Sequence, residues 1–420
     1  MAQFRIVDVV PQTHSNETWQ DAEPSIGVNL ADPSQIVVSA FTPPDSGDSN
    51  GPIYYSEDGG VNWSLSFIVP GGEPNDQTYK FGSRSNQFYG AILSDGSLSY
   101  NPLSTSDPFV PGTMTVLETV DDNDQPFITA TTVEYGPDAG KDRFYVGVND
   151  LSVSTGQSAA IDVCLDATAA SPTITRSYID QRSTGTAGQD GPQVRVAAHA
   201  DGTIYAIFAG WRAEASEITM DVVVVRDDDW ASGGSPFTAL IDPGDSTAGF
   251  RVQTGVLIVW DQIFGQERTA GSFAIAVDPR DSDRVAICWA GLASGAYTLN
   301  IQMSTNRGVS WSPVLLQVSN ATNPALAISV TGKIGFLYQQ DTGTSPSDKW
   351  ETHFQESTNG STWTDTLLAT TPAETPALNT GEGLTYIGDY LDMVAVGKNF
   401  YGAFCANNTP DPANFPTVMA

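Results

Sequence analysis

The sequence contains few cysteines and no long apolar run. Its three cysteines, Cys164, Cys288 and Cys405, are an odd number, and each has apolar, strand-like neighbours. This pattern argues against a disulfide framework and indicates small buried hydrophobic side chains. A catalytic thiol is the alternative, but no base stands near any of them in the sequence. No stretch approaches the roughly 18 apolar residues of a membrane-spanning helix, so we do not expect membrane insertion.

Basic residues are also scarce. The chain has 18 Lys and Arg against 49 Asp and Glu, a net charge of −31, although charged residues make up only 16% of the sequence. A negative field of this size repels phosphate backbones and anionic lipid surfaces, so a nucleic-acid partner is not expected. The N-terminus has no basic segment followed by an apolar one, so no signal peptide is visible.

The sequence does contain a repeated unit. An apolar strand, a tight turn rich in Asp, Gly or Pro and a second apolar strand recur six times, with a weaker copy around residues 79–93. This is the pattern of β-hairpins. The copies begin near residues 24, 79, 126, 193, 272, 325 and 387. Their mean spacing of about 60 residues suits a four-stranded propeller blade. No window has sustained helical periodicity, so the sequence predicts an all-β fold, a single β-propeller with seven blades preferred over six.

We expect one domain over residues 1–420. The predicted blades span residues 22–70, 75–120, 121–180, 190–245, 270–320, 321–375 and 380–420. Residues 243–270 are a predicted insertion, which is either a binding element or a surface loop. Little chain is left after the last hairpin for further strands. Residues 1–10 are therefore expected to supply a strand to the last blade and close the ring.

Three segments downstream of such hairpins share Ser, Asp or Asn, Gly and Trp in a fixed order. They are YYSEDGGVNWS, QMSTNRGVSWS and QESTNGSTWTD. Their motif residues are Ser56, Asp58, Gly60, Trp63, Ser304, Asn306, Gly308, Trp311, Ser357, Asn359, Gly360 and Trp363. The pattern resembles the Asp-box, or BNR repeat, of the sialidase superfamily, with Asn for Asp in two copies and one residue fewer in the third. The resemblance implies structural turns between the third and fourth strands of a blade, away from the ligand face. Ser and Asp side chains that bond nearby backbone suit this role.

A catalytic sialidase, by this resemblance, would have three arginines that hold a carboxylate, a Tyr–Glu nucleophile pair and an Asp acid or base. Several residues near inner strands or their loops are candidate ligand contacts: Arg84, Arg195, Arg212, Arg268, Trp211 and Tyr390. None of these arginines stands in a motif of the family. Arg5, in FRIV, lacks the proline of the first family motif and is not assigned. Sialidase activity is therefore not the favoured interpretation.

Acidic and amide residues recur just before the inner strands: Asp21, Glu23, Asp76, Gln77, Asp122, Asp124, Gln125, Asp190, Asn323 and Asp389. In a propeller these positions meet around the axis at one face. The residues could be turn formers, could hold a polar ligand or cation, or could include the two carboxyls of a glycoside hydrolase. The catalytic candidates are Asp21, Glu23, Asp122, Asp124 and Asp190. Asp124, Asp190 and Asp389 are the candidates for a Ca²⁺ site, although no cofactor is required.

We therefore expect a protein that engages a glycan or polysaccharide at its axial mouth. A binding or adhesion module is favoured, because the arginine cluster is not recognisable. The alternatives are an exo-acting, sialidase-like glycoside hydrolase that uses paired carboxylates, and a purely structural assembly component. An extracellular or surface-associated location is favoured. The sequence specifies neither the glycan nor the oligomeric state.

Overall fold

The computed structural model describes most of the chain, and the statements below concern these residues. They are 4–10, 22–41, 50–71, 74–94, 99–105, 109, 112–153, 157–182, 193–214, 218–258, 272–343, 349–372 and 388–406. All regular elements in them are strands. No helix in this part of the chain has the length and apolarity to cross a membrane.

Six antiparallel sheets of four strands follow one another along the described chain, each built from consecutive strands. Blade one has β1 (Ala22–Val28), β2 (Ile36–Phe41), β3 (Asn50–Ser56) and β4 (Ser64–Pro70). Blade two has β5 (Pro74–Phe81), β6 (Phe88–Ser94), β7 (Ser99–Thr105) and β8 (Thr115–Val116). Blade three has β9 (Asn123–Thr132), β10 (Asp142–Asp150), β11 (Ala159–Cys164) and β12 (Ile174–Tyr178).

The second half of the chain repeats this order. Blade four has β13 (Arg195–Ala198), β14 (Ile204–Glu214), β15 (Ile218–Asp227) and β16 (Phe250–Ile258). Blade five has β17 (Phe273–Asp278), β18 (Asp281–Ala293), β19 (Ala296–Ser304) and β20 (Leu316–Ser319). Blade six has β21 (Ala321–Ile328), β22 (Ile334–Thr342), β23 (Lys349–Ser357) and β24 (Thr364–Pro372). A final hairpin joins β25 (Asp392–Val396) to β26 (Asn399–Ala403).

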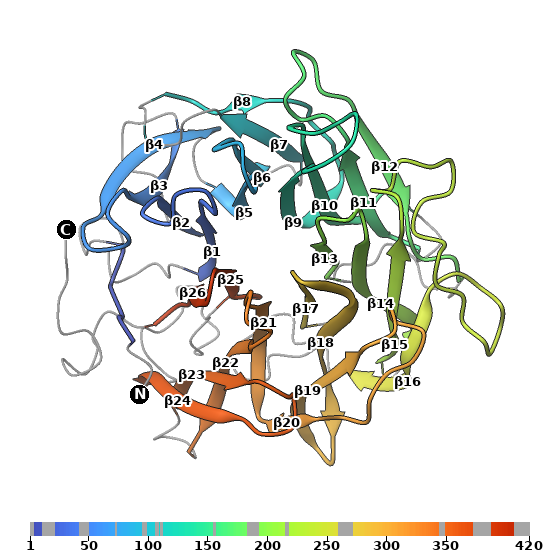
Figure 1. Cartoon of the computed structure of the whole chain (residues 1–420). Coiled ribbons are helices and arrows are strands. Elements are labelled where there is room, and N and C mark those ends of the chain that lie inside the picture. The colour runs from blue at the N-terminus through green and yellow to red at the C-terminus, as the bar shows by residue number, and fades with distance from the viewer. Residues whose placement is uncertain are drawn as a thin grey trace.

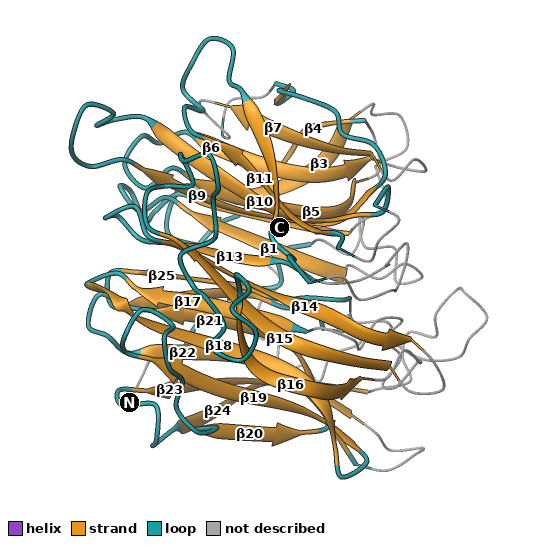
Figure 2. Ribbon diagram, turned by 90° about the vertical axis from the view of Figure 1, so that its right-hand side faces the viewer, coloured by secondary structure: helices purple, strands orange, loops and turns teal. Residues whose placement is uncertain are grey.

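The sheets form a ring around an axis, which confirms the predicted single β-propeller. Figure 1 shows the first strand of each sheet nearest the centre and the fourth strand of each blade at the outside. Figure 2 shows the sheets from the side, packed face to face, with loops at both ends of the strands. The described residues form six four-stranded blades, so the sequence-based preference for seven blades is not supported. The hairpin β25–β26 lies between blades six and one, against β21 and β1.

Residues 4–10 reach the place where the sequence predicted a closing strand, but they do not form a regular strand. Asp8 alone takes part in a β-bridge. Val9 packs against an apolar cluster that includes Val396 and Ala403 of the hairpin. Phe4 contacts Phe354 of blade six, with ring centroids 5.8 Å apart. The segment thus fills the space beside the hairpin by side-chain packing.

The core consists of apolar layers between neighbouring sheets. The second strand β10 is buried at every position, whereas the outer strand β12 of the same blade is at least partly exposed along its length. This difference arises because inner strands have a blade on each face, and their sequences are accordingly near-continuous in apolar residues. Cys164 and Cys288 are buried in these layers as free thiols, and Cys405 is half-buried. Burial raises the pKa of Cys164 to about 11, so this thiol is inert at neutral pH.

The predicted insertion at residues 243–270 is partly regular structure. Residues 250–258 are β16, which pairs with β15 as the outer strand of blade four. Residues 259–271 lie outside the described part of the chain. The connection before β16 is fixed by ion pairs, since Arg251 bonds Asp242 and Arg182 bonds Asp245, both at 2.8 Å.

Candidate functional site

The inner strands begin with a repeated backbone irregularity. The pairing register with the second strand shifts between Ala22 and Ser25 in blade one and between Thr322 and Ala325 in blade six. Glu23, Gln125 and Asn323 have positive φ values of 53°, 51° and 53°, and each precedes a proline. A non-glycine residue in this conformation is strained, and a bulge changes the direction of its side chain. Here the bulge turns these three side chains toward the axis.

The side chains turned inward hold one short segment, residues 388–391, which we call the axial segment. Asn323 Nδ2 donates to the carbonyl oxygen of Gly388 at 2.8 Å. Gln193 Nε2 donates to the carbonyl oxygen of Asp389 at 3.0 Å, and Gln125 Nε2 to Asp389 Oδ2 at 3.2 Å. Blades three, four and six therefore bind the same four residues.

Blades one and two bind the axial segment as well. The backbone N–H of Asp389 donates to Glu23 Oε1 at 3.3 Å, and the N–H of Gln77 donates to the hydroxyl of Tyr390 at 3.2 Å. Glu23, Gln77, Gln125, Gln193, Asn323 and Tyr390 thus form a buried polar ring, which we call the axial ring. The expectation that polar residues from distant stretches meet at the axis agrees with this arrangement. The centre of the axial ring is occupied by residues 388–391 of the same chain.

Two cations lie next to the axial ring. Lys80 pairs with Asp392, which also accepts hydrogen bonds from Ser25 Oγ at 3.0 Å and from the N–H of Ile26 at 2.9 Å. The guanidinium of Arg195 lies 4.2 Å from the centroid of the Phe127 ring and 5.4 Å from that of Tyr390. These charges balance part of the negative field of the buried acids.

Burial determines the protonation states of Arg195 and Tyr390 at the axial ring. Burial lowers the pKa of Arg195 to about 10, and the neighbouring Tyr390, Asp76, Asp392 and Asp389 oppose this shift. Burial also raises the pKa of Tyr390 well above its usual value, and Asp76 and Glu23 add to the rise. At neutral pH Arg195 is therefore charged and Tyr390 is neutral. Neither group has a pKa near 7, as an efficient general acid or base would.

The five candidate catalytic residues lie in different environments. Glu23 and Asp124 are buried, and both accept backbone hydrogen bonds: Glu23 from Asp389, and Asp124 Oδ1 from the N–H of Gln125 at 2.9 Å. Asp122 is exposed, in the bend before β9. Asp21 and Asp190 lie outside the described residues. The two buried carboxylates thus hold backbone.

Of the five candidate ligand contacts that the structure describes, Arg195 and Tyr390 lie at the axis. Arg84 follows the far end of β5, is 63% exposed and pairs with Glu134 at 2.7 Å. Arg212 pairs with Asp221 within blade four, and Trp211 is buried in the apolar layer between blades four and five. These three side chains are thus engaged in other contacts, and their role in ligand binding stays a prediction. Proximity to an inner strand along the chain does not specify which end or face a side chain takes. Arg268 lies outside the described residues.

The Ca²⁺ site stays a prediction. Within the described part of the chain no group of three or more His, Cys, Asp and Glu side chains has the geometry to hold a metal ion. Asp124 and Asp389 are both buried near the axis, whereas Asp190, the third candidate, lies outside the described residues.

Each of the three motif segments forms a tight turn between the third and fourth strands of its blade. Ser56 Oγ accepts the N–H of Gly60, Ser304 Oγ that of Gly308 and Ser357 Oγ that of Gly360, all at 2.8 Å. Asp58 Oδ1 accepts the N–H groups of Val61 and Asn62 at 2.9 Å. These bonds satisfy the backbone of the turn, and they lie at the opposite end of the sheets from the axial ring. The side chains are thus used in local structure.

Sequence reasoning missed three residues in or beside the axial ring: Gln193, Lys80 and Asp392. Gln193 occupies the same repeat position as Gln125, at the start of an inner strand, so the repeat itself contained a signal for it. Lys80 and Asp392 are far apart in the sequence and follow no local pattern. Only the closure of the ring brings blade two and the last hairpin together.

The buried carboxyl of Asp180, which follows β12, makes folding stability depend on pH. Burial raises the pKa of Asp180 to about 6, although hydrogen bonding by the N–H of Arg182 opposes the shift. The carboxyl is therefore easier to protonate in the folded chain than in the unfolded chain, and its ionisation reduces stability as the pH rises from about 4 to 6. We expect Asp180→Asn to be more stable than the wild type by about 2 kcal/mol at pH 7.5, with the difference vanishing below pH 4. Urea unfolding at both pH values measures this. An equal effect at both would contradict the assignment.

Comparisons with known proteins show the fold. No protein-family model and no curated protein sequence matches the chain. Among solved structures, a polysaccharide lyase, ulvan lyase, is similar with a TM-score of 0.53 at 7% identity, covering 92% of this chain and 94% of the other. A xyloglucanase from Xanthomonas campestris has a TM-score of 0.48 at 12% identity, covering 88% of this chain and 51% of the other, so the chain spans about half its length. An α-L-arabinofuranosidase from Fusarium graminearum has a TM-score of 0.45 at 12% identity, covering 80% and 91%.

Proposed function

We propose that this protein is a glycan-binding propeller that holds a polysaccharide at its axial face and does not cleave it. The observation that carries the choice of binding over cleavage is that Glu23, in the axial ring, and Asp124, next to it, both accept backbone hydrogen bonds. A glycosidase needs one carboxyl to give up a proton and another to act as base or nucleophile beside the sugar. Buried carboxylates that hold backbone suit neither role.

The glycan class is supported by the fold and by charge. The ulvan lyase of similar fold is, by its name, a polysaccharide-acting protein. A chain with a net charge of −31 repels an anionic glycan but not a neutral one. We also assign the three serine-based turns to the Asp-box type and the chain to the sialidase-like propellers. An extracellular or surface-associated location belongs to the same proposal.

The test is a glycan array combined with an assay for newly formed reducing or unsaturated ends. We expect saturable binding of at least one neutral glycan and no product. Asp122, the exposed member of the predicted ring, has a positive φ of 56°, so Asp122→Gly removes its side chain without straining the turn. We expect this variant to bind about tenfold more weakly, as the loss of a hydrogen bond to a charged group predicts.

The matched control is Arg84→Ala, which changes an exposed residue at the other end of the sheets and should leave the affinity unchanged. Product release that is lost in Glu23→Gln or Asp124→Asn would overturn the proposal in favour of a hydrolase. Absence of binding to any glycan would favour the assembly role. Repeating the array with EDTA tests the Ca²⁺ site, since a bridging ion would make binding depend on calcium.

A further inference from the structure

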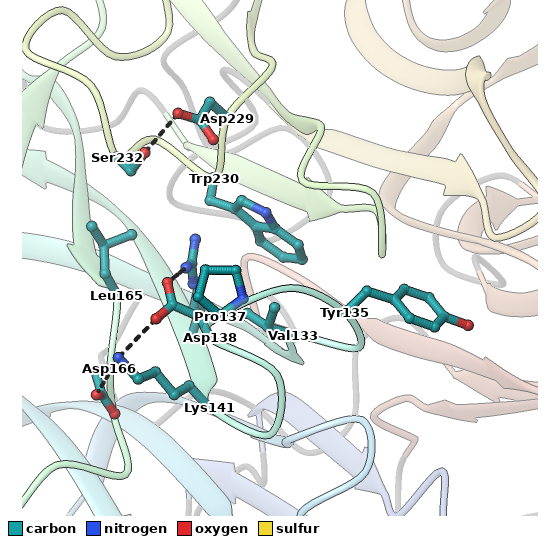
Figure 3. Close-up of a pocket in the computed structure, with 11 residues that line it drawn as sticks. Val133, Tyr135, Pro137, Asp138, Lys141, Leu165, Asp166, Asp229, Trp230 and Ser232 are labelled. Atoms are coloured by element: carbon teal, nitrogen blue, oxygen red, sulfur yellow. Dashed lines mark hydrogen bonds and ion pairs between the residues drawn. The ribbon is translucent and has the colours of Figure 1, made fainter.

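A cavity of about 330 Å³ lies between blades three and four, at the end of the sheets opposite to the axial segment. Three connections line it: the β9–β10 turn, the residues after β11 and the residues after β15. Figure 3 shows Trp230, Pro137 and Val133 on one side and the polar chain of Asp138, Lys141 and Asp166 on the other. Its volume lies within the roughly 300–1,000 Å³ of small-molecule sites. The sequence motifs assign no role to this place.

The connection after β15 forms the same type of turn as the three serine-based turns, although its sequence lacks the serine. Asp227, the last residue of β15, accepts the N–H of Asp229 at 2.8 Å and that of Ala231 at 2.7 Å through Oδ1. Ser56 Oγ, at the end of β3, accepts the N–H groups two and four residues later in the same way. Asp227 therefore replaces the serine of the turn. Its second oxygen also accepts the N–H of Phe237 at 3.1 Å.

The third residue after the serine position determines what projects from this turn. Gly59, Arg307 and Trp230 occupy it in blades one, five and four, with φ values of 76°, 61° and 59°. Arg307 reaches back to blade four, where it bonds Thr203 at 2.9 Å. Trp230 likewise reaches back to blade three. The turn thus places a side chain across the gap to the preceding blade, and in blade four that side chain is an indole.

Trp230 is held firmly in this position. The guanidinium of Arg143 in blade three lies 4.8 Å from the centroid of the indole, and Tyr145 donates its hydroxyl hydrogen to the carbonyl oxygen of Trp230 at 3.1 Å. Gly202 packs so closely that an added Cβ would lie 2.6 Å from Nε1 of the indole. A bulky residue with positive φ costs folding energy, and such strain concentrates where a side chain has a functional task. The fold therefore presents a fixed aromatic wall.

The remaining walls combine an exposed ring with matched charges. Tyr135 stands at the edge of the cavity, is 79% exposed and points away from Trp230 (Figure 3). Lys141 pairs with Asp138 at 2.9 Å and with Asp166 at 3.1 Å, and Arg143 pairs with Asp138 at 2.7 Å. Both cations are thus already neutralised by carboxylates, and Asp229 adds a further negative charge. The cavity offers no positive charge to an anionic ligand, but several hydrogen-bonding groups to hydroxyls.

We propose that this cavity binds one neutral sugar unit of a glycan, with a C–H face of the sugar against Trp230 and its hydroxyls on Asp138, Lys141 and Asp166, while Tyr135 borders the opening. Apolar and aromatic walls with a few fixed polar groups are the usual composition of small-ligand sites. The inference takes its ligand class from the proposed function, but the place is a second one, at the opposite end of the sheets from the axial ring. A chain bound at both places would be gripped on two faces of the propeller.

The test is calorimetric titration of the full chain with neutral gluco-, xylo-, arabino- and galacto-oligosaccharides. Trp230→Gly gives blade four the residue that blade one has in its turn, so it removes the indole and relieves the backbone. Tyr135→Ala removes an exposed ring and leaves the fold unaffected. We expect Trp230→Gly to weaken binding about tenfold, the loss of roughly 1.4 kcal/mol of aromatic contact, and Tyr135→Ala, at the edge of the cavity, to weaken it less. The matched control is Val309→Ala, an exposed side chain in the equivalent turn of blade five.

The outcomes separate this inference from the proposed function. If neutral sugars bind and both Trp230→Gly and Tyr135→Ala bind them as the wild type does, the cavity proposal is overturned and the axial one stands. If these variants lose binding and Asp122→Gly does not, the cavity proposal stands and the axial one falls. Binding of tetramethylammonium or of uronate-containing oligosaccharides at the cavity, more tightly than neutral sugars, would overturn the ligand class. Absence of binding to any sugar would overturn both proposals.

Discussion

Asp392→Asn is expected to lower the free energy of unfolding by about 3 kcal/mol, because removing one partner of a buried ion pair leaves the other charge without compensation. Asparagine can still accept the hydrogen bonds from Ser25 and Ile26, but it cannot balance the ammonium of Lys80. The Lys80 side chain keeps 16% exposure, which places the effect at the low end for such pairs. Chemical denaturation of the two proteins measures the loss.

The matched control for Asp392 is the double variant Lys80→Met with Asp392→Asn. It removes the ammonium together with the carboxylate, so we expect it to recover at least half of the lost stability. A double variant that is no more stable than Asp392→Asn would mean that the hydrogen bonds of Asp392, rather than its charge, hold the last hairpin against blades one and two.

Asp227→Ala is expected to lower the free energy of unfolding by about 3 kcal/mol, since three backbone N–H groups lose their acceptor at once. Two of them belong to Ala231 and Phe237, which are buried, so water cannot readily replace the carboxylate. Trp230 lies within this turn, and we expect its indole to lose its fixed position. Urea unfolding gives the stability, and the near-ultraviolet circular dichroism reports the environment of the indole.

Asp227→Ser is the matched control, because Ser56 forms the equivalent turn in blade one with a hydroxyl alone. We expect it to keep most of the stability and to lose only the bond to Phe237. If serine is as damaging as alanine, blade four does not contain a copy of the turn, and the position of Trp230 needs another explanation.

The use of arginine explains why the carboxylate-gripping cluster of a sialidase is not found among the described residues. Arg176 bonds Asp150 and Asp162 within blade three, both at 2.7 Å. Arg284 bonds Asp278 within blade five at 2.6 Å. These guanidinium groups join neighbouring strands, and their planar forks suit such pairing. Arg176 and Arg284 thus stabilise individual blades, whereas Arg307 joins blade five to blade four.

The sequence predicted the architecture well because each blade is a local structure. Hairpin turns and near-continuous apolar strands lie within short stretches, so the inner strands β1, β9, β13, β17 and β21 begin close to the predicted positions, whereas β5 begins at Pro74, earlier than predicted. The blade number was less accessible. The last copy has a clear hairpin, but whether further strands join it depends on distant segments, and residues 4–10 fill the space without a regular strand.

The candidate site was predictable only in outline. The sequence indicated that polar residues before the inner strands meet at the axis, because ring symmetry brings equivalent positions together. It did not indicate that residues 388–391 of the same chain would bind them, that Trp211 would face the apolar layer, or that Arg84 would follow the far end of its strand. These outcomes depend on strand direction and on which face of a sheet a side chain takes.

The amino-acid sequence by itself determined the all-β repeat, the three serine-based turns and the negative charge, since each follows from composition or from contacts a few residues apart. Tertiary structure alone decided the pairing of Lys80 with Asp392, the closure of the axial ring and the cavity beside Trp230. The physical reason is that these features join residues from different blades. Their contacts exist only after the ring has closed, and no local pattern in the chain records them.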